Sequence, residues 1–240
     1  LALGWAAWKT YLARPETDQH RTLAVGVLGI ALISSRRPEE ALPAIEVSLA
    51  LTRRYSGDEN AIIITLENRA SCLDDLGRRD EALAIRREIY GKRVARGAPA
   101  LISAADKVVN AGGNLCCSLI NAGRFAEAKA LLRDHLVPKA RQSLGPDHGL
   151  TIDIEEWLSE AIFKDHEASR GDQHSATQLR EAETLLQRAL PRRRRVFGPA
   201  HPKTVWCENE LSLVRRALAV PTRDAYPNSH KVGWGRGREH

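Results

Sequence analysis

The sequence predicts an all-α protein, folded as a right-handed α-solenoid of antiparallel helix pairs. A Glu-Ala pair recurs four times, with its alanine at Ala41, Ala82, Ala128 and Ala182. Apolar residues follow each alanine at most of the offsets three, four, seven and eight, which share one side of a helix. The alanines are 41, 46 and 54 residues apart, so each period holds two ordinary helices with their turns. Aromatic residues make up only 5% of the chain, which favours close helix packing by alanine and leucine.

The pattern places the helices in consecutive pairs. Residues 1–14, with Trp5 and Trp8, are expected to be the remnant helix of a preceding repeat, and residues 15–219 an array of four to five pairs. First helices are expected at about 22–35, 60–76, 102–122, 151–165 and 203–219, and second helices at about 39–55, 79–96, 124–143 and 177–196. Gly77-Arg78 and Gly123-Arg124 predict tight turns within two pairs, because glycine accepts the left-handed backbone that ends a helix.

Several segments are expected to depart from a regular repeat. Pro138 and Pro191 should kink or shorten the second helices that contain them, because proline lacks an amide hydrogen. A polar loop is expected at 165–178, and a disordered tail at 220–240. Between pairs, a Leu-Gly-Pro-Asp-His phrase at 144–148 has a counterpart at 197–202, and its histidine is expected to pack or cap. The first unit has Ser35-Arg36-Arg37-Pro38 in place of a Gly-Arg turn, and glycines in its first helix, which predicts a looser repeat.

Composition excludes several classes of protein. The longest apolar run, 23–33, is shorter than the roughly 18 residues of a membrane span, so no membrane association is expected. The four cysteines form no CxxC pair, which argues against a metal site or a disulfide framework and favours a reducing compartment. The expected location is the cytoplasm. The chain starts at Leu1 and has no methionine, which indicates a fragment whose targeting signals are not visible.

Two recurring phrases carry a resemblance to a known family. The Gly-Arg-x-x-Glu-Ala phrases at 77–82 and 123–128, together with the Leu-Gly-Pro-Asp-His phrase, resemble tetratricopeptide repeats, and the long-period repeats of kinesin light chains above all. The resemblance covers about 15–219 and is strongest at 60–96 and 102–143. It implies a superhelical scaffold that binds other proteins, but it does not identify the partner.

The expected binding site is one stripe of the first helices, which line the concave surface in arrays of this kind. The stripe positions proposed for a peptide-binding groove are Asn68, Ser71, Asp75, Asn110, Asn114, Cys117, Asn121 and Trp157, and further stripe positions are Leu23, Val27, Ile30, Ser34, Ile64, Asp153, Glu160, Lys164, Trp206, Glu210 and Leu213. A carboxamide carries a donor and an acceptor, so the asparagines can pair with the backbone of an extended peptide. Groove asparagines of kinesin light chain repeats resemble them in this respect. The alternatives are hydrated surface for the asparagines and core packing for Trp157.

Other functions compete with this scaffold. A clamp for a carboxyl terminus needs lysine or arginine on the stripe, and the two best-matched units have none, so an internal segment is the expected ligand. The alternative is a nucleic-acid or acidic-polymer binder that uses the arginine-rich surface and tail. The four arginines at 192–195 wrap around a helix, which disfavours that alternative. The chain shows no catalytic constellation, so we expect no enzyme activity, cofactor, metal or small-molecule substrate. A regulatory fragment of a larger enzyme is a third possibility.

Overall fold

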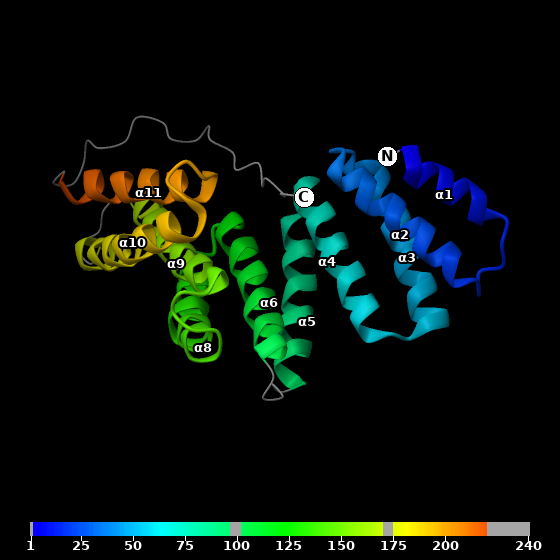
Figure 1. Ribbon diagram of the computed structural model, residues 1–240, viewed down its shortest axis with the longest axis horizontal. Helices are drawn as coiled ribbons and strands as arrows, with labels where there is room; N and C mark the ends of the chain where they lie inside the picture. The colour runs from blue at the N-terminus through cyan, green and yellow to red at the C-terminus, as the bar shows by residue number, and fades with distance from the viewer. Residues whose placement is uncertain (1, 97–101, 170–174, 220–240) are drawn as a thin grey trace. The chain divides into compact units, whose positions relative to one another are not determined.

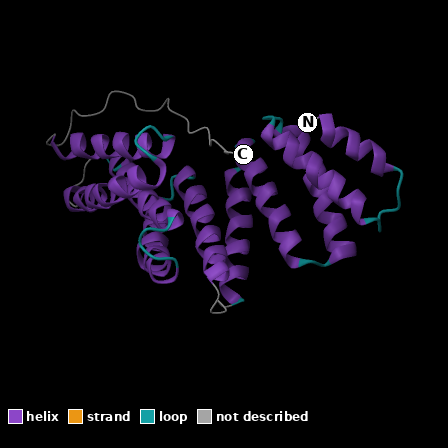
Figure 2. Ribbon diagram, in the orientation of Figure 1, coloured by secondary structure: helices purple, strands orange, loops and turns teal. Residues whose placement is uncertain are grey.

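The computed structural model describes residues 2–96, 102–169 and 175–219, and every element within them is helical (Figures 1 and 2). The helices are α1 (Ala2–Leu12), α2 (Gln19–Ser34), α3 (Pro38–Leu51), α4 (Glu59–Asp75), α5 (Arg79–Ala95), α6 (Ile102–Asn121), α7 (Phe125–Ala130), α8 (Val137–Ser143), α9 (Gly149–Ala168), α10 (Ser175–Phe197) and α11 (Pro202–Ala219), with π-helical turns η1 (Thr52–Ser56) and η2 (Leu131–Leu136). Their order confirms the predicted succession of helix pairs.

The chain divides into two compact units, Leu1–Trp157 and Leu158–His240, with the boundary inside α9. In unit one each helix packs against the next one along the chain, from α1 to α6, and the segment α7–η2–α8 packs back on α6. In unit two α10 and α11 form a packed pair. The predicted disordered tail at 220–240 lies outside the described residues.

The repeated alanines form the inner contacts of the pairs. Ala41, Ala82, Ala128 and Ala182 have no exposed surface, as the pattern predicts. Around the first two of them, α2 to α6 share one hydrophobic core, and Trp5 and Trp8 of α1 pack against it. The core of unit one therefore extends across successive pairs, as the stacking of repeats requires.

One turn geometry closes all three pairs of unit one. Gly77 and Gly123 have φ of 75° and 73°, and the next residue, an arginine, donates its amide hydrogen to a leucine carbonyl at the end of the preceding helix. The arginine side chain then pairs with the glutamate three residues later, as Arg78 with Glu81 (2.6 Å) and Arg124 with Glu127 (2.5 Å). The recurring Gly-Arg-x-x-Glu phrase is thus the sequence of this turn.

The first pair keeps the same turn without its glycine. Arg36 takes the left-handed position with φ of 56°, and Arg37 pairs with Glu40 just as Arg78 pairs with Glu81. The glycines of α2 serve packing instead, since a Cβ on Gly29 would lie 2.8 Å from Ile45. The looser first repeat that we predicted is therefore wrong for the turn.

Arg86, a polar residue four positions after Ala82 in an otherwise apolar pattern, is explained by its partners. Arg86 is 4% exposed, and it donates to Asp74 of α4 and to Ser118 of α6. A buried guanidinium is tolerated only when it is paired, and this one connects three successive helices of unit one.

Histidine caps both copies of the linker phrase. The Nδ1 atom of His148 accepts the Leu150 amide hydrogen at 3.3 Å, and the Nδ1 atom of His201 accepts that of Lys203 at 3.2 Å. These bonds satisfy amide groups in the first turns of α9 and α11. The predicted capping role is confirmed.

Pro138 acts as predicted, whereas Pro191 and the long loop differ from the predictions. Before Pro138 the helix widens into the π-helical turn η2 and then resumes as α8, which fits the loss of an amide hydrogen there. The helix α10 runs past Pro191 to Phe197, so it is not shortened. The helix α9 extends to Ala168 and α10 starts at Ser175, so the loop is shorter than 165–178.

Candidate peptide-binding groove

The predicted stripe residues of α4 and α6 are all at least partly exposed. Ile64, Asp75, Asn110 and Asn121 are exposed, and Asn68, Ser71, Asn114 and Cys117 are half-buried. Between them on the same helices, Ile63, Leu66 and Leu119 are buried. We call the solvent side of α4 and α6 that carries these stripe residues, together with the side of α2 that carries Leu23, Val27 and Ile30, the stripe face. The asparagines are available to a ligand, and none is buried between helices.

The last member of the predicted site, Trp157, packs on a neighbouring helix. A Cβ placed on Gly113 of α6 would lie 2.4 Å from the Trp157 ring, so this glycine makes room for the indole. Trp157 remains half-buried. It therefore joins α9 to α6 within unit one and presents only part of its ring to solvent.

The cysteines behave as small packing groups. Cys72, Cys116 and Cys207 are buried and Cys117 is half-buried, and all four are free thiols. Burial raises the pKa of Cys72 to about 11 and also raises that of Cys116, so these two thiols stay protonated at neutral pH. Cys117 belongs to the stripe face by position.

A hollow opens on the stripe face between α2 and α4. It encloses about 860 Å³. Its walls are Leu23, Val27, Ile30, Ala61, Ile64, Thr65 and Asn68, its floor is Gly26, Ile45, Ser48 and Thr52, and its end is formed by Thr17, Asp18, Gln19, His20, Thr22, Tyr55, Ser56 and Asp58. Asn68, a residue of the predicted site, thus shares a hollow with the apolar stripe of α2.

The apolar wall of this hollow consists of predicted stripe positions that were not among the eight proposed groove residues. Leu23, Val27, Ile30 and Ile64 are 61%, 52%, 43% and 54% exposed. The signal is present in the sequence of α2, where Leu23, Val27 and Ile30 add a second apolar face to the buried face of Leu28 and Leu32. A helix that is apolar on both faces needs a second partner or a ligand.

Two carboxylates stand at the end of the hollow where α2 and α4 begin. Asp18 accepts the His20 amide hydrogen at 2.8 Å, and Asp58 accepts that of Asn60 at 2.9 Å, so each caps a helix. Arg14 donates to Asp18 at 3.0 Å, and this hydrogen bond is the main reason that the pKa of Asp18 is lowered.

The stripe residues of unit two form a more acidic group. Glu210 of α11 has its pKa raised to about 7, mainly by burial and then by the nearby Glu160. Lys164 opposes this shift and pairs with Glu160 at 3.3 Å. This group holds one carboxyl that gains or loses a proton near neutral pH.

The arginine run at 192–195 does not present one basic patch. Arg193 is fully buried in α10, with its guanidinium 5.5 Å from the centre of the Phe197 ring. Arg194 pairs with Glu208 of α11 at 2.7 Å. At least two of the four arginines therefore make contacts within the protein. Arg193 packs on the end of its own helix α10, and Arg194 joins α10 to α11.

The described residues also lack the features of two other kinds of site. Nowhere in 2–96, 102–169 and 175–219 do three or more histidine, cysteine or acidic side chains gather closely enough to hold a metal. Over the same ranges, no helix has the length and apolar character needed to cross a membrane.

The helix pairs and their shared turn have the architecture of a tetratricopeptide repeat array. A family model described as tetratricopeptide repeat matches residues 175–203. Among solved structures, the chain resembles BtubC (BKLC) from P. vanneervenii, with a TM-score of 0.69 and 16% identity over 91% of this chain and 82% of that one. It also resembles two structures of kinesin light chain-like proteins with nearly identical TPR-like repeats from Podospora anserina. One has a TM-score of 0.64 and 16% identity, over 83% of this chain and 87% of that one. The other has a TM-score of 0.63 and 15% identity, over 86% of this chain and 89% of that one.

At these identities the structural likeness shows the fold. The kinesin light chain-like long-period repeat that the sequence resembles is confirmed at that level. No curated protein matches the chain.

Proposed function

We propose that this chain is a non-catalytic scaffold that binds an extended segment of a partner protein along the stripe face. Tetratricopeptide folds are generally protein-interaction modules, which gives the broad class. The finer proposal depends mainly on one observation. Asn68, Asn110, Asn114 and Asn121 occupy stripe positions of two successive first helices, and none of them is buried.

Carboxamides in this arrangement suit a peptide backbone. Each one can donate to a carbonyl and accept from an amide hydrogen, so an extended segment satisfies its main chain whatever its side chains are. The stripes of α4 and α6 contain no lysine or arginine that could hold a terminal carboxylate. The ligand is therefore an internal segment, with Ser71, Asp75, Cys117 and Trp157 as flanking contacts. The four free thiols suit the cytoplasm as its location.

The test compares the intact chain with a variant that carries Asn68→Ala, Asn110→Ala, Asn114→Ala and Asn121→Ala. Peptides of about 12 residues are selected from a random library on the intact chain, and their affinities for both proteins are measured by fluorescence anisotropy. We expect at least tenfold weaker binding to the variant, because each lost hydrogen bond to the peptide contributes about 1 kcal/mol.

The matched control removes exposed carboxamides elsewhere. Gln142→Ala and Gln187→Ala lie on α8 and α10, which are second helices, and they should leave the affinity unchanged. Circular dichroism establishes that all variants are folded. Equal binding of the selected peptides by the four-alanine variant would refute the proposal.

A further inference from the structure

We propose that the hollow between α2 and α4 binds an apolar stretch of the partner segment that carries a lysine or arginine beside its apolar residues. The apolar side chains would lie on Leu23, Val27, Ile30 and Ile64, and the cation at Asp18 and Asp58. This inference rests on the proposed function and adds the chemistry of the partner.

The first step is the apolar surface. Leu23, Val27 and Ile30 follow one another at helical spacing on α2, and Ile64 faces the same hollow from α4. All four are more than two-fifths exposed, although α2 already buries its other face in the core. A contiguous exposed apolar surface rimmed by polar residues is typical of a binding site.

The second step is the space. Gly26 has no side chain, and a Cβ there would lie 3.1 Å from the Ser48 hydroxyl, so the floor of the hollow has small residues at this point. Ser48 and Thr52 are buried although they are polar, and Thr52 donates its hydroxyl hydrogen to the Ser48 carbonyl at 2.8 Å. The resulting volume of about 860 Å³ falls in the range of pockets that enclose most of a bound group.

The third step is the charge of the lining. Asp18 and Asp58 line the hollow, and no lysine or arginine does. Asp58 forms no ion pair within the described part of the chain, whereas Asp18 pairs with Arg14 at the rim. Arg54 is held outside the lining by Glu16, at 3.5 Å. A partner cation at this end would therefore meet the carboxylate of Asp58, which has no ion pair among the described residues, and that of Asp18, which already pairs with Arg14.

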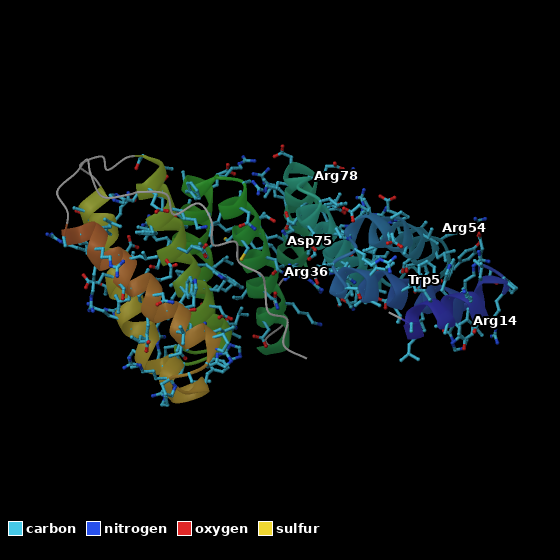
Figure 3. The ribbon with its side chains drawn as sticks, turned by 90° about the horizontal axis from the view of Figure 1, so that it is seen from above. Trp5, Arg14, Arg36, Arg54, Asp75 and Arg78 are labelled. Carbon is cyan, nitrogen blue, oxygen red and sulfur yellow. The ribbon has the colours of Figure 1, made fainter. Side chains whose placement is uncertain are left out.

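The opposite ends of α2 and α4 contribute no charged residue to the hollow. Figure 3 shows Arg14 and Arg54 toward one end of the first unit, and Arg36 and Asp75 toward the carboxyl ends of α2 and α4. Arg36 and Asp75 do not line the hollow, whereas Asp18 and Asp58 do, so a partner cation would bind at the end with Asp18 and Asp58. Complementary charge of this kind fixes the direction in which a segment binds.

A protein segment fits this hollow better than a small molecule does. The hollow is open on the stripe face, and Asn68 belongs to its wall. A chain whose apolar residues fill the hollow can continue past Asn68 toward the asparagines of α6. A free apolar molecule would use neither Asn68 nor the two carboxylates.

The test uses the peptides selected on the intact chain and three variants. Leu23→Ser with Ile64→Ser removes apolar wall, and we expect more than tenfold weaker binding. Asp18→Asn with Asp58→Asn removes both charges but keeps both helix caps, because asparagine caps as well as aspartate does. We expect this variant to bind the selected peptides three- to tenfold more weakly than the intact chain does. It should bind a selected peptide and the same peptide with its lysine or arginine replaced by glutamine with equal affinity.

The control is Val94→Ser on α5, an apolar side chain 49% exposed that lies outside the hollow, and it should bind as the intact chain does. The selected peptides should share two or three large apolar residues with a basic residue on one side. Peptides that lack this pattern, or that bind both double variants unchanged, would overturn the inference.

The outcomes separate the two proposals. Peptides weakened by the four asparagine changes but not by changes in the hollow would refute this inference alone. Selection of no peptide would refute both. An apolar dye such as anilinonaphthalene sulfonate that binds the hollow, while the selected peptides bind elsewhere, would make it a small-molecule site and overturn the inference.

Discussion

Arg36 shows how one residue can adopt a repeat geometry that its neighbours reach with glycine. Its φ of 56° lies in the left-handed region, where a side chain costs about 1 kcal/mol, and Gly77 and Gly123 occupy the same place in the next two turns. The turn forms because Arg37 still donates its amide hydrogen to the Leu32 carbonyl, and the Arg37 side chain still donates to Glu40. The ion pair between Arg37 and Glu40 offsets the backbone cost of the left-handed conformation at Arg36.

We expect Arg36→Gly to raise the free energy of unfolding by about 0.5–1 kcal/mol, because it removes this backbone cost. The reciprocal change, Gly77→Ala, should lower it by about 1 kcal/mol. Urea denaturation followed by circular dichroism measures both. A loss of stability in Arg36→Gly would mean that the arginine side chain contributes more than the backbone costs.

Glu210 should make the stability of unit two depend on pH. Its pKa in the folded chain is about 7, against 4.5 for a free glutamate, so folding favours its protonated form. The stability from this group is fully present below pH 4.5, and it is lost as the pH rises through 7. Glu210→Gln should therefore raise the melting temperature at pH 8, with a gain of roughly 1–3 kcal/mol, and change it little at pH 4.5.

Thermal denaturation at the two pH values measures this effect, with Glu39→Gln on α3 as control. The groups around Glu210, namely Glu160, Lys164 and Glu167, remain in place in both proteins. An equal change in melting temperature at pH 4.5 and pH 8 would contradict the role of burial.

At the scale of elements, two glycines inside helices have opposite roles. A Cβ on Gly113 would meet the Trp157 ring at 2.4 Å, whereas a Cβ on Gly91 of α5 would meet nothing within 4 Å. Gly113→Ala should therefore destabilise unit one by about 1–3 kcal/mol and shift the Trp157 fluorescence. Gly91→Ala should stabilise it by about 0.5–1 kcal/mol, because alanine is the better helix former. Similar effects of the two changes would mean that α6 and α9 do not pack closely at this point.

The order and type of the helices could be predicted because local signals agree with packing. The Glu-Ala register, the glycine turns and the histidine caps each act over a few residues, and each is repeated. The burial of Arg86 could not be predicted, because it depends on Asp74 and Ser118, which are distant in the sequence. The predicted loop at 165–178 was too long because polar residues at helix ends resemble those of loops.

The position of the stripe residues could be predicted, but the apolar hollow beside them could not. Helical spacing placed the stripe residues of α4 and α6 on the exposed side, since the buried residues of the same helices repeat with the same period. The hollow was missed because it depends on Gly26 and Ser48, which come from different helices. The distance between those helices is a property of the packed pair.

At the scale of the whole molecule, the net charge of +6 does not imply a nucleic-acid ligand. Many cations pair with acidic side chains in the described residues, as Arg87 does with Glu127 and Arg215 with Glu183. Peptide affinity should therefore change by about tenfold or less between roughly 50 and 200 mM salt, since at most one or two charges take part. A steep decrease across that range, as seen when several phosphates are bound, would favour the acidic-polymer alternative.

The carboxamides of the stripe face can be observed one by one. In a 26.6-kDa chain, the side-chain amide resonances of Asn68, Asn110, Asn114 and Asn121 can be followed by heteronuclear NMR as a selected peptide is added. We expect all four to shift to saturation with one affinity, while those of Gln142 and Gln187 stay in place. Saturated binding that leaves the four asparagine resonances unmoved would contradict the proposed groove.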